Sequence, residues 1–263
     1  MNSDCDNKEE FISGITTFLH LAYLQKCLIG EGIIPDDQDN ETKLENIIHH
    51  YPNSIHSDLF DIRSMKKICN LYEAIIIFLD NPFLHTFDIH LFTPELAKQI
   101  HSYIGKNDVI QNCGKYRKKD ARPAQSDYWY YRPDLIEKKI EELFEKTRTL
   151  MIALPKDTKS STIAQAIKIS ATFVGTFLDI HPFSNGNGRV VRLLFSLLMS
   201  PFSVVPIPIF ANGSKGKNTW LECLEEGKME YPYKYDGLAT FLLEKMYTCM
   251  NQTCYLLDLD LTF

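Results

Sequence analysis

The chain has 263 residues, 44% hydrophobic and 24% charged, enough to bury one large core or a core plus a smaller lobe. Its net charge of −6 disfavours binding to a nucleic-acid backbone. The longest apolar tract, 193–210, contains three prolines, so we do not expect it to cross a membrane as one helix. Seven scattered cysteines without a CxxC pair indicate free thiols, and the acidic start lacks a signal peptide's features. We therefore expect a cytoplasmic protein.

Apolar residues recur at helical spacing through most of the chain. Thr93 can cap a helix and Pro94 suits its first position. The aromatic run 128-YWYY-131, within 117–134, instead has high strand propensity. These patterns predict an all-α fold with one small β-hairpin. In chain order, helices are expected over 8–30, 41–50, 64–81, from 93, 133–150, 160–180, from about 187, 217–228 and 235–248.

A short basic cluster, 115-KYRKK-119, is the main local exception to the acidic charge balance. Four basic residues in a five-residue segment are too few to define a nucleic-acid surface, and such runs are usually solvated. We interpret it as a solvated loop.

The segment 181-HPFSNGNGRVVR-192 combines a histidine, two glycines and two arginines where a helix is expected to begin. Free N–H groups at a helix start favour anions, and glycine lets the backbone approach a ligand closely. Arg189 and Arg192, three residues apart, can both reach phosphate oxygens from one helical face. His181 titrates near neutral pH and can accept a proton from a hydroxyl. The alternative is a polar loop that ends one helix and caps the next.

The whole string resembles the signature HPFx(D/E)GNGRxxR of the Fic (filamentation induced by cAMP) family, with eight of nine specified positions matched. The resemblance extends over roughly 70–250. Upstream, 114-GKYR-117 and the aromatic run are similar to the family's flap hairpin. Downstream, 217–233 is similar to its nucleotide-side helix, with Trp220 at one aromatic position. The resemblance implies a Fic-type helical bundle with a hairpin flap.

The resemblance also implies an activity, the transfer of AMP from ATP to a Ser, Thr or Tyr hydroxyl of a target protein. His181 would be the general base, and Phe183 would fix the loop in the core. Asn187 would contact the α-phosphate, with the backbone of Gly186 and Gly188 completing the anion hole. Arg189 and Arg192 would hold the β- and γ-phosphates. The flap residues Tyr128, Trp129, Tyr130 and Tyr131 would align the target segment by strand-like pairing.

Asn185 departs from the signature, because most family members carry Asp or Glu there as a Mg²⁺ ligand. Hard Mg²⁺ prefers charged oxygen ligands, and an amide oxygen supplies no negative charge. We therefore expect Mg²⁺ as the cofactor, held weakly at Asn185.

Near the N-terminus, 27-CLIGEG-32 resembles the inhibitory pattern (S/T)xxxE(G/N) of many Fic proteins, with Cys27 at the Ser/Thr position. A Glu31 carboxylate beside Arg192 would occupy the donors that the γ-phosphate needs. The alternative is that Glu31 merely ends a helix. We accordingly divide the chain into an N-terminal helical segment, 1–69, with a candidate regulatory role, and a catalytic domain, 70–263.

Three classes of function remain open: an AMP transferase, an enzyme that removes AMP from a modified protein, and an inactive nucleotide-binding module. The retained His181 argues against the last. The expected partners are ATP and a hydroxyl-bearing target protein, without nucleic acid or membrane, and a homodimer is compatible with the sequence.

Overall fold

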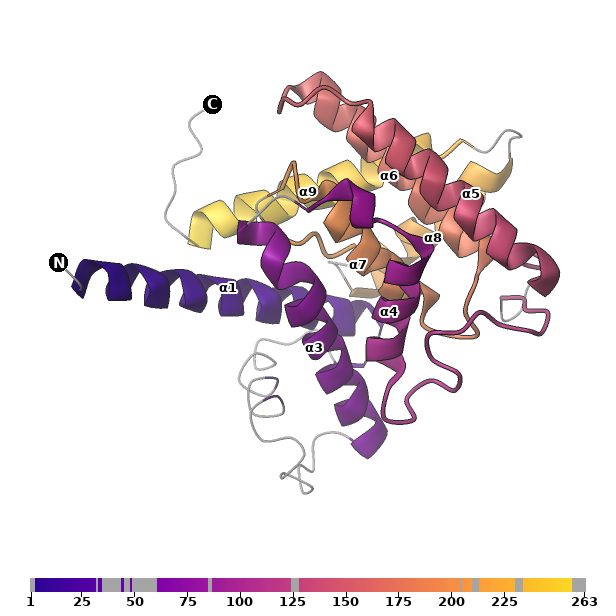
Figure 1. The fold of residues 1–263 in the computed structure, drawn as a ribbon, viewed down its shortest axis with the longest axis horizontal. Helices are drawn as coiled ribbons and strands as arrows, with labels where there is room; N and C mark the ends of the chain where they lie inside the picture. The colour runs from indigo at the N-terminus through magenta and orange to yellow at the C-terminus, as the bar shows by residue number, and fades with distance from the viewer. Residues whose placement is uncertain are drawn as a thin grey trace.

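The computed structural model describes residues 3–31, 33–34, 44, 48, 61–84, 87–123, 128–203, 205–209, 213–229 and 234–256. All regular secondary structure in these residues is helical (Figure 1). Several helices pack around a central one, α7, and the N-terminal part of α1 extends away from the others (Figure 1). The helices are α1 (Ser3–Gly30), α3 (Ile62–Leu84), the short 3₁₀ helix η1 (Ile89–Leu91), α4 (Pro94–Gly105), α5 (Pro133–Ile152), α6 (Ser160–Ile180), α7 (Asn187–Met199), α8 (Gly213–Met229) and α9 (Asp236–Leu256).

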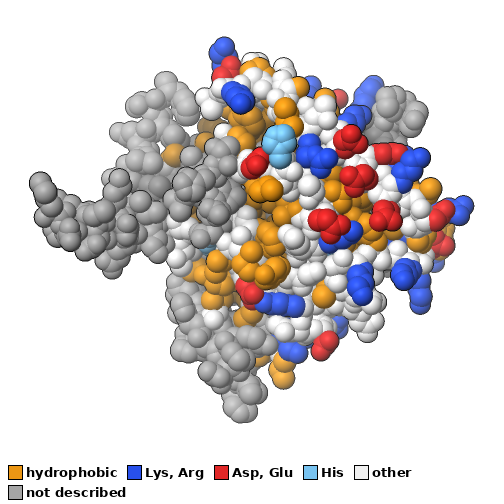
Figure 2. All heavy atoms as spheres, viewed as in Figure 1, with side chains coloured by type: hydrophobic (Ala, Val, Ile, Leu, Met, Phe, Trp, Pro, Cys, Tyr) orange, Lys and Arg blue, Asp and Glu red, His pale blue; other side chains and the backbone are white. Residues whose placement is uncertain are grey.

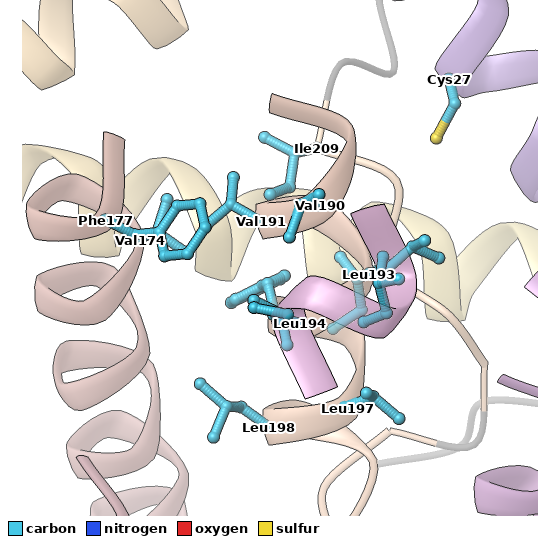
Figure 3. Close-up of a cluster of buried hydrophobic side chains, with 14 of the residues drawn as sticks. Cys27, Val174, Phe177, Val190, Val191, Leu193, Leu194, Leu197, Leu198 and Ile209 are labelled. Atoms are coloured by element: carbon cyan, nitrogen blue, oxygen red, sulfur yellow. The ribbon is translucent and has the colours of Figure 1, made fainter. Parts of the chain in front are cut away.

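Helix α7 lies at the centre of the fold, and every residue from Arg189 to Met199 is buried, including the polar side chains of Arg189, Arg192 and Ser196. Its leucines and valines are buried, and they meet Val174 and Phe177 of α6 and Ile209 (Figure 3). A helix whose broad apolar surface is buried in this way belongs to the core. The N-terminal end of α7, which follows the HPF segment, is thereby fixed by the packing of the whole helix.

A cluster of aromatic rings joins α5 and α6 to the segment before α4. The rings of Phe92, Phe144 and Phe173 are all fully buried, with centroids 4.8 to 5.0 Å apart. Tilted and edge-on pairs at such distances add to the stability that burial alone provides. This cluster fixes α6, whose last residue precedes His181.

The helices expected from apolar spacing are present, mostly within a few residues of the predicted ends. The expected span 160–180 coincides with α6, and Thr93 caps α4 by accepting a hydrogen bond from the Leu96 N–H at 3.3 Å. The helix expected over 41–50 lies mostly outside the described residues. The division after residue 69 stays a prediction, and residue 69 lies within α3.

The hairpin expected within 117–134 is not formed in the described residues 117–123 and 128–134. One backbone–backbone hydrogen bond joins the described parts of its two arms, from the N–H of Tyr130 to the carbonyl of Ala121 at 3.1 Å. The arms are therefore adjacent, without a ladder of strand hydrogen bonds.

Helix α6 is, among the described helices, the one long and apolar enough to cross a membrane by length and composition. More than half of its most apolar window is buried inside the protein, where it packs against α5, α7 and α9. This burial is typical of a core helix. On the face shown in Figure 2, basic and acidic side chains are interspersed over the described surface.

Candidate functional site

The loop from His181 to Gly186 turns the chain from α6 into α7. His181 takes a left-handed conformation, with φ of 51°, and its N–H donates to the Phe177 carbonyl at 3.0 Å, which ends α6. Gly186 is also left-handed, with φ of 79°, and a Cβ there would lie 2.8 Å from Ile110 Cδ1. Glycine is thus required at 186 for both its conformation and its packing. The turn leaves the first N–H groups of α7 without helical partners, as an anion site requires.

Asn187 ties this loop together from inside. Its Oδ1 accepts the Phe183 N–H at 3.0 Å, and its Nδ2 donates to the Phe183 carbonyl at 2.8 Å. The Asn187 side chain is 2% exposed, and Phe183 is fully buried, as expected for a loop anchor. The expected contact of Asn187 with a phosphate stays a prediction, since in this structure its amide is bound to the loop.

His101, on α4, supports the same loop and was not found by sequence reasoning. Its ring stacks on Phe183 with centroids 3.9 Å apart. Nε2 donates to the Asn185 carbonyl at 3.0 Å, and Nδ1 accepts the Gly114 N–H at 2.8 Å. Burial lowers the pKa of His101 to about 4, so the ring is neutral. The sequence feature that could have pointed to His101 is its position next to Ile100, on the apolar face of its helix.

Arg117 joins the flap to the loop 181–186, which corrects the interpretation of 115–119 as a solvated loop. The lysines of this cluster are exposed, but the Arg117 side chain is 7% exposed. Nε donates to the His181 carbonyl at 2.7 Å and Nη1 to the Lys119 carbonyl at 2.8 Å. Nη2 donates to the carbonyls of Tyr131 and Ile180. A planar fork of five N–H donors can serve several acceptors at once, which explains why one arginine can hold four carbonyls.

Arg189 and Arg192 lie side by side on the first turns of α7 and face Glu31. Arg192 Nη2 donates to Glu31 Oε1, and Arg189 Nε lies 3.4 Å from Oε2. Burial opposes the charge of Arg192, but the Glu31 carboxylate, with Cys27 and Tyr23, raises its pKa overall. Burial lowers the pKa of Arg189 from a very high ordinary value. Two guanidinium groups thus meet one carboxylate at the anion-binding end of a helix.

Glu31 follows the last residue of α1, where it ends the helix and also contacts Arg189 and Arg192; its inhibitory role stays a prediction. Its N–H donates to the Cys27 carbonyl at 3.1 Å, and the Ile33 N–H donates to the Leu28 carbonyl at 2.9 Å, which closes the helix end. Cys27 is buried beneath it, and burial raises the pKa of its thiol to about 11. The helix end aims the carboxylate at Arg189 and Arg192.

The imidazole of His181 is covered by the flap. The ring of Tyr130 stacks on it with centroids 3.9 Å apart and planes 7° apart. Burial, together with the positive charges of Arg117 and Lys228, lowers the pKa of His181 to about 4. The ring is therefore neutral at pH 7 and able to accept a proton. Nδ1 is buried and has no hydrogen-bond partner among the described residues.

The other flap aromatics point in different directions. Tyr128 donates its hydroxyl proton to Asp179 on α6. Trp129 is 57% exposed, with the Arg122 guanidinium 5.3 Å from its ring centroid. Tyr131 contributes its carbonyl to Arg117. The flap thus has an inner side that covers His181 and an outer side that carries an exposed indole.

The residues around Asn185 do not fit a tightly held Mg²⁺. Asn185 Oδ1 already accepts the Gly186 N–H at 2.7 Å, and an amide brings no charge. The Glu31 carboxylate is engaged by Arg189 and Arg192. Among the described residues, no three His, Cys, Asp or Glu side chains cluster to hold a metal ion.

Trp220 of α8 packs into the core, 3% exposed, with its ring 6.0 Å from that of Phe241. Trp220, which the resemblance placed at an aromatic position of the family's nucleotide-side helix, is therefore a core residue in this structure.

Comparison with known proteins agrees with this geometry. Residues 91–199, from η1 to the end of α7, match the sequence model of the Fic/DOC family. A Fido domain-containing protein of Dictyostelium discoideum is 32% identical over 108 residues, which cover 41% of this chain and 68% of that protein. Among solved structures, a Fic family protein of Desulfovibrio desulfuricans superposes with a TM-score of 0.68 at 14% identity, covering 94% of this chain and 68% of that one. Fic-1 of C. elegans superposes with a TM-score of 0.62 at 14% sequence identity, and the match covers 92% of this chain and 64% of that one. At such identities the structural likeness shows the fold.

Proposed function

Because this chain belongs to the Fic/DOC family, whose members generally transfer nucleotide-derived groups to proteins, we propose that it transfers AMP from ATP to a hydroxyl of a target protein. The observation that carries the proposal is the pairing of a neutral histidine with two buried arginines across one loop. The histidine supplies a base, and the arginines with the free end of α7 supply an anion site.

In the proposed reaction, the target hydroxyl oxygen attacks the α-phosphorus of ATP while its proton passes to His181. The bond from the α-phosphorus to the bridging oxygen breaks, and pyrophosphate leaves. Arg189 and Arg192 hold the β- and γ-phosphates and stabilise the negative charge that develops on the leaving group. Mg²⁺ would arrive bound to ATP phosphates, with Asn185 as a weak ligand.

We further propose that Glu31 restrains this activity. Its carboxylate occupies the donors of Arg192 and Arg189, and a γ-phosphate would need the same donors. Since hydrogen bonds between charged groups stabilise by roughly 1.5–3 kcal/mol, removal of the carboxylate should tighten ATP binding by about 10- to 100-fold.

The position of Glu31 also favours a second candidate, the removal of AMP from a modified protein. A carboxylate at the arginine pair can position a water for attack on the α-phosphorus, which would make Glu31 necessary for this reaction. The two activities therefore predict opposite effects of Glu31 substitution.

Labelled ATP, with incorporation into the protein itself and into cell-extract proteins, tests the proposal. Glu31→Gly should raise ATP affinity and transfer, and Glu31→Gln should act similarly because it removes the charge at constant size. His181→Ala should lower transfer by about 10²- to 10⁴-fold without weakening ATP binding, whereas His90→Ala, at an exposed histidine, should match the wild type.

Three outcomes separate the alternatives. If Glu31→Gly binds ATP no tighter than the wild type, the restraint is wrong. If it binds ATP but transfers nothing, the chain is a nucleotide-binding module. If the wild type releases AMP from AMP-modified protein and Glu31→Gly does not, removal is the activity.

A further inference from the structure

Asp179 is a buried carboxylate that the proposed reaction does not use. It lies two residues before His181 near the end of α6 and is fully buried. Its Oδ1 accepts the hydroxyl of Tyr128 and lies 3.2 Å from Nζ of Lys228, on α8. Its Oδ2 has no hydrogen-bond partner among the described residues. A buried charge is costly unless it is paired, so this carboxylate depends on Tyr128 and Lys228.

The contacts of Asp179 extend to the catalytic base through the flap. Lys228 Nζ lies 4.5 Å from the ring centroid of Tyr128, which attracts the cation. The ring of Tyr128 packs edge-on against that of Tyr130, with centroids 5.9 Å apart. Tyr130 in turn stacks on His181. One continuous set of contacts thus links α6 and α8, through two flap tyrosines, to the imidazole.

The Tyr130 ring closes one face of His181 to any incoming group. Rings with centroids 3.9 Å apart are in van der Waals contact, so no further side chain fits between them. Tyr128 and Tyr130 contact each other, although Tyr128 is 38% exposed, whereas Trp129 between them is 57% exposed. Release of Tyr128 would therefore remove a ring contact that helps to hold Tyr130 over the imidazole, alongside the hydrogen bond from the Tyr130 N–H to the Ala121 carbonyl.

We propose that Tyr128, Asp179 and Lys228 form a latch that holds the flap closed over His181 on the acceptor side of the site. Asp179 acts as a positioning residue, because it holds Tyr128 and through it Tyr130. The latch is separate from Glu31, which contacts the phosphate-side arginines on α7. A target segment opens the site by displacing Tyr130, so access of the hydroxyl and binding of the nucleotide are controlled at two places.

The latch can be tested without ATP or a target, by the rate at which diethyl pyrocarbonate modifies His181, read by mass spectrometry of the full chain. Tyr128→Phe keeps the ring and removes the hydroxyl that Asp179 accepts. It should raise His181 reactivity by about tenfold, the population change expected from loss of one hydrogen bond to a charged group. Asp179→Asn should raise it less, because the amide oxygen still accepts but carries no charge.

His90 and Tyr247 provide matched controls within the same chain. Exposed His90 should react equally in all variants, and Tyr247→Phe, at a tyrosine that is 62% exposed, should leave His181 at the wild-type rate. Glu31→Gly should also leave the His181 rate unchanged, because the two contacts are separate.

Two results would overturn the latch. One is a His181 rate in Tyr128→Phe equal to that of the wild type. The other is an equal rise at fully buried His101, which would indicate general loosening of the fold. Because the readout needs no nucleotide transfer, failure of the latch is distinguishable from failure of the proposed function.

Discussion

Asn185 lies in the loop before α7 with its side-chain oxygen turned back onto the Gly186 N–H at 2.7 Å. An aspartate in this place would present a charged oxygen to a hard cation next to the phosphate-binding end of α7. Under the proposed function, this residue would therefore set how strongly the chain itself contributes to Mg²⁺ binding.

Asn185→Asp should lower the Mg²⁺ concentration needed for half-maximal transfer, on the order of tenfold, because one charged ligand replaces a neutral one. Transfer is measured across a Mg²⁺ titration at fixed ATP. Ser184→Asp, which adds the same charge at the adjacent exposed position, is the control and should shift the curve little. Equal curves for Asn185→Asp and the wild type at every Mg²⁺ level would contradict the prediction.

Single residues show where sequence reasoning reaches its limit. Glu31 could be matched to Arg192 across 161 positions because each lies in a local pattern that can be recognised alone. His101 contacts the loop across 84 positions and Arg117 across 64, and neither belongs to such a pattern. Their roles depend on which helices pack together, and that information is not local. Asn187 has a recognisable position, but the sequence does not reveal that its amide binds Phe183.

At the scale of elements, the helices were predictable and the flap was not. Helix α6 has the expected ends because its apolar spacing and its following His-Pro segment are both local signals. The flap has one backbone–backbone hydrogen bond between its described arms. Its position depends instead on side chains, above all on Arg117, whose donors reach carbonyls on both arms and the carbonyl of His181.

Arg117→Lys should lower the free energy of unfolding by about 3 kcal/mol, because an ammonium keeps the charge but cannot reach four carbonyls in a planar fork. Urea denaturation followed by circular dichroism measures the change. Arg122→Lys, at an exposed flap position beside Trp129, should cost much less. Equal losses for the two variants would show that the carbonyl contacts of Arg117 contribute little.

At the scale of the whole molecule, the free energy of unfolding should depend on pH because two buried histidines are neutral in the folded protein. Burial lowers the pKa of both His101 and His181 to about 4, whereas an unfolded histidine titrates near 6.5. Between these values the unfolded chain binds more protons, so stability is full above about pH 6.5 and is lost as pH falls towards 4.

His101→Gln should therefore show a shallower loss of stability between pH 6.5 and 4.5 than the wild type, although it is less stable at pH 7. The contribution of His101 over the full range is up to about 3 kcal/mol. Urea unfolding at several pH values measures the slopes, and exposed His90→Gln should keep the wild-type slope. A His101→Gln slope as steep as that of the wild type would refute this assignment.

The arrangement of Glu31 between two arginines has a consequence for how an anion first approaches. Two guanidinium groups face one carboxylate, so an excess of one positive charge remains at the start of α7, and Nη1 of Arg189 has no hydrogen-bond partner among the described residues. The chain as a whole carries −6. This local excess would draw a polyphosphate inward against the repulsion of the surrounding protein. Because Nη1 of Arg189 is buried, an anion reaches it only as Glu31 moves aside, and this unpaired donor then offers the anion a hydrogen bond that the carboxylate does not make.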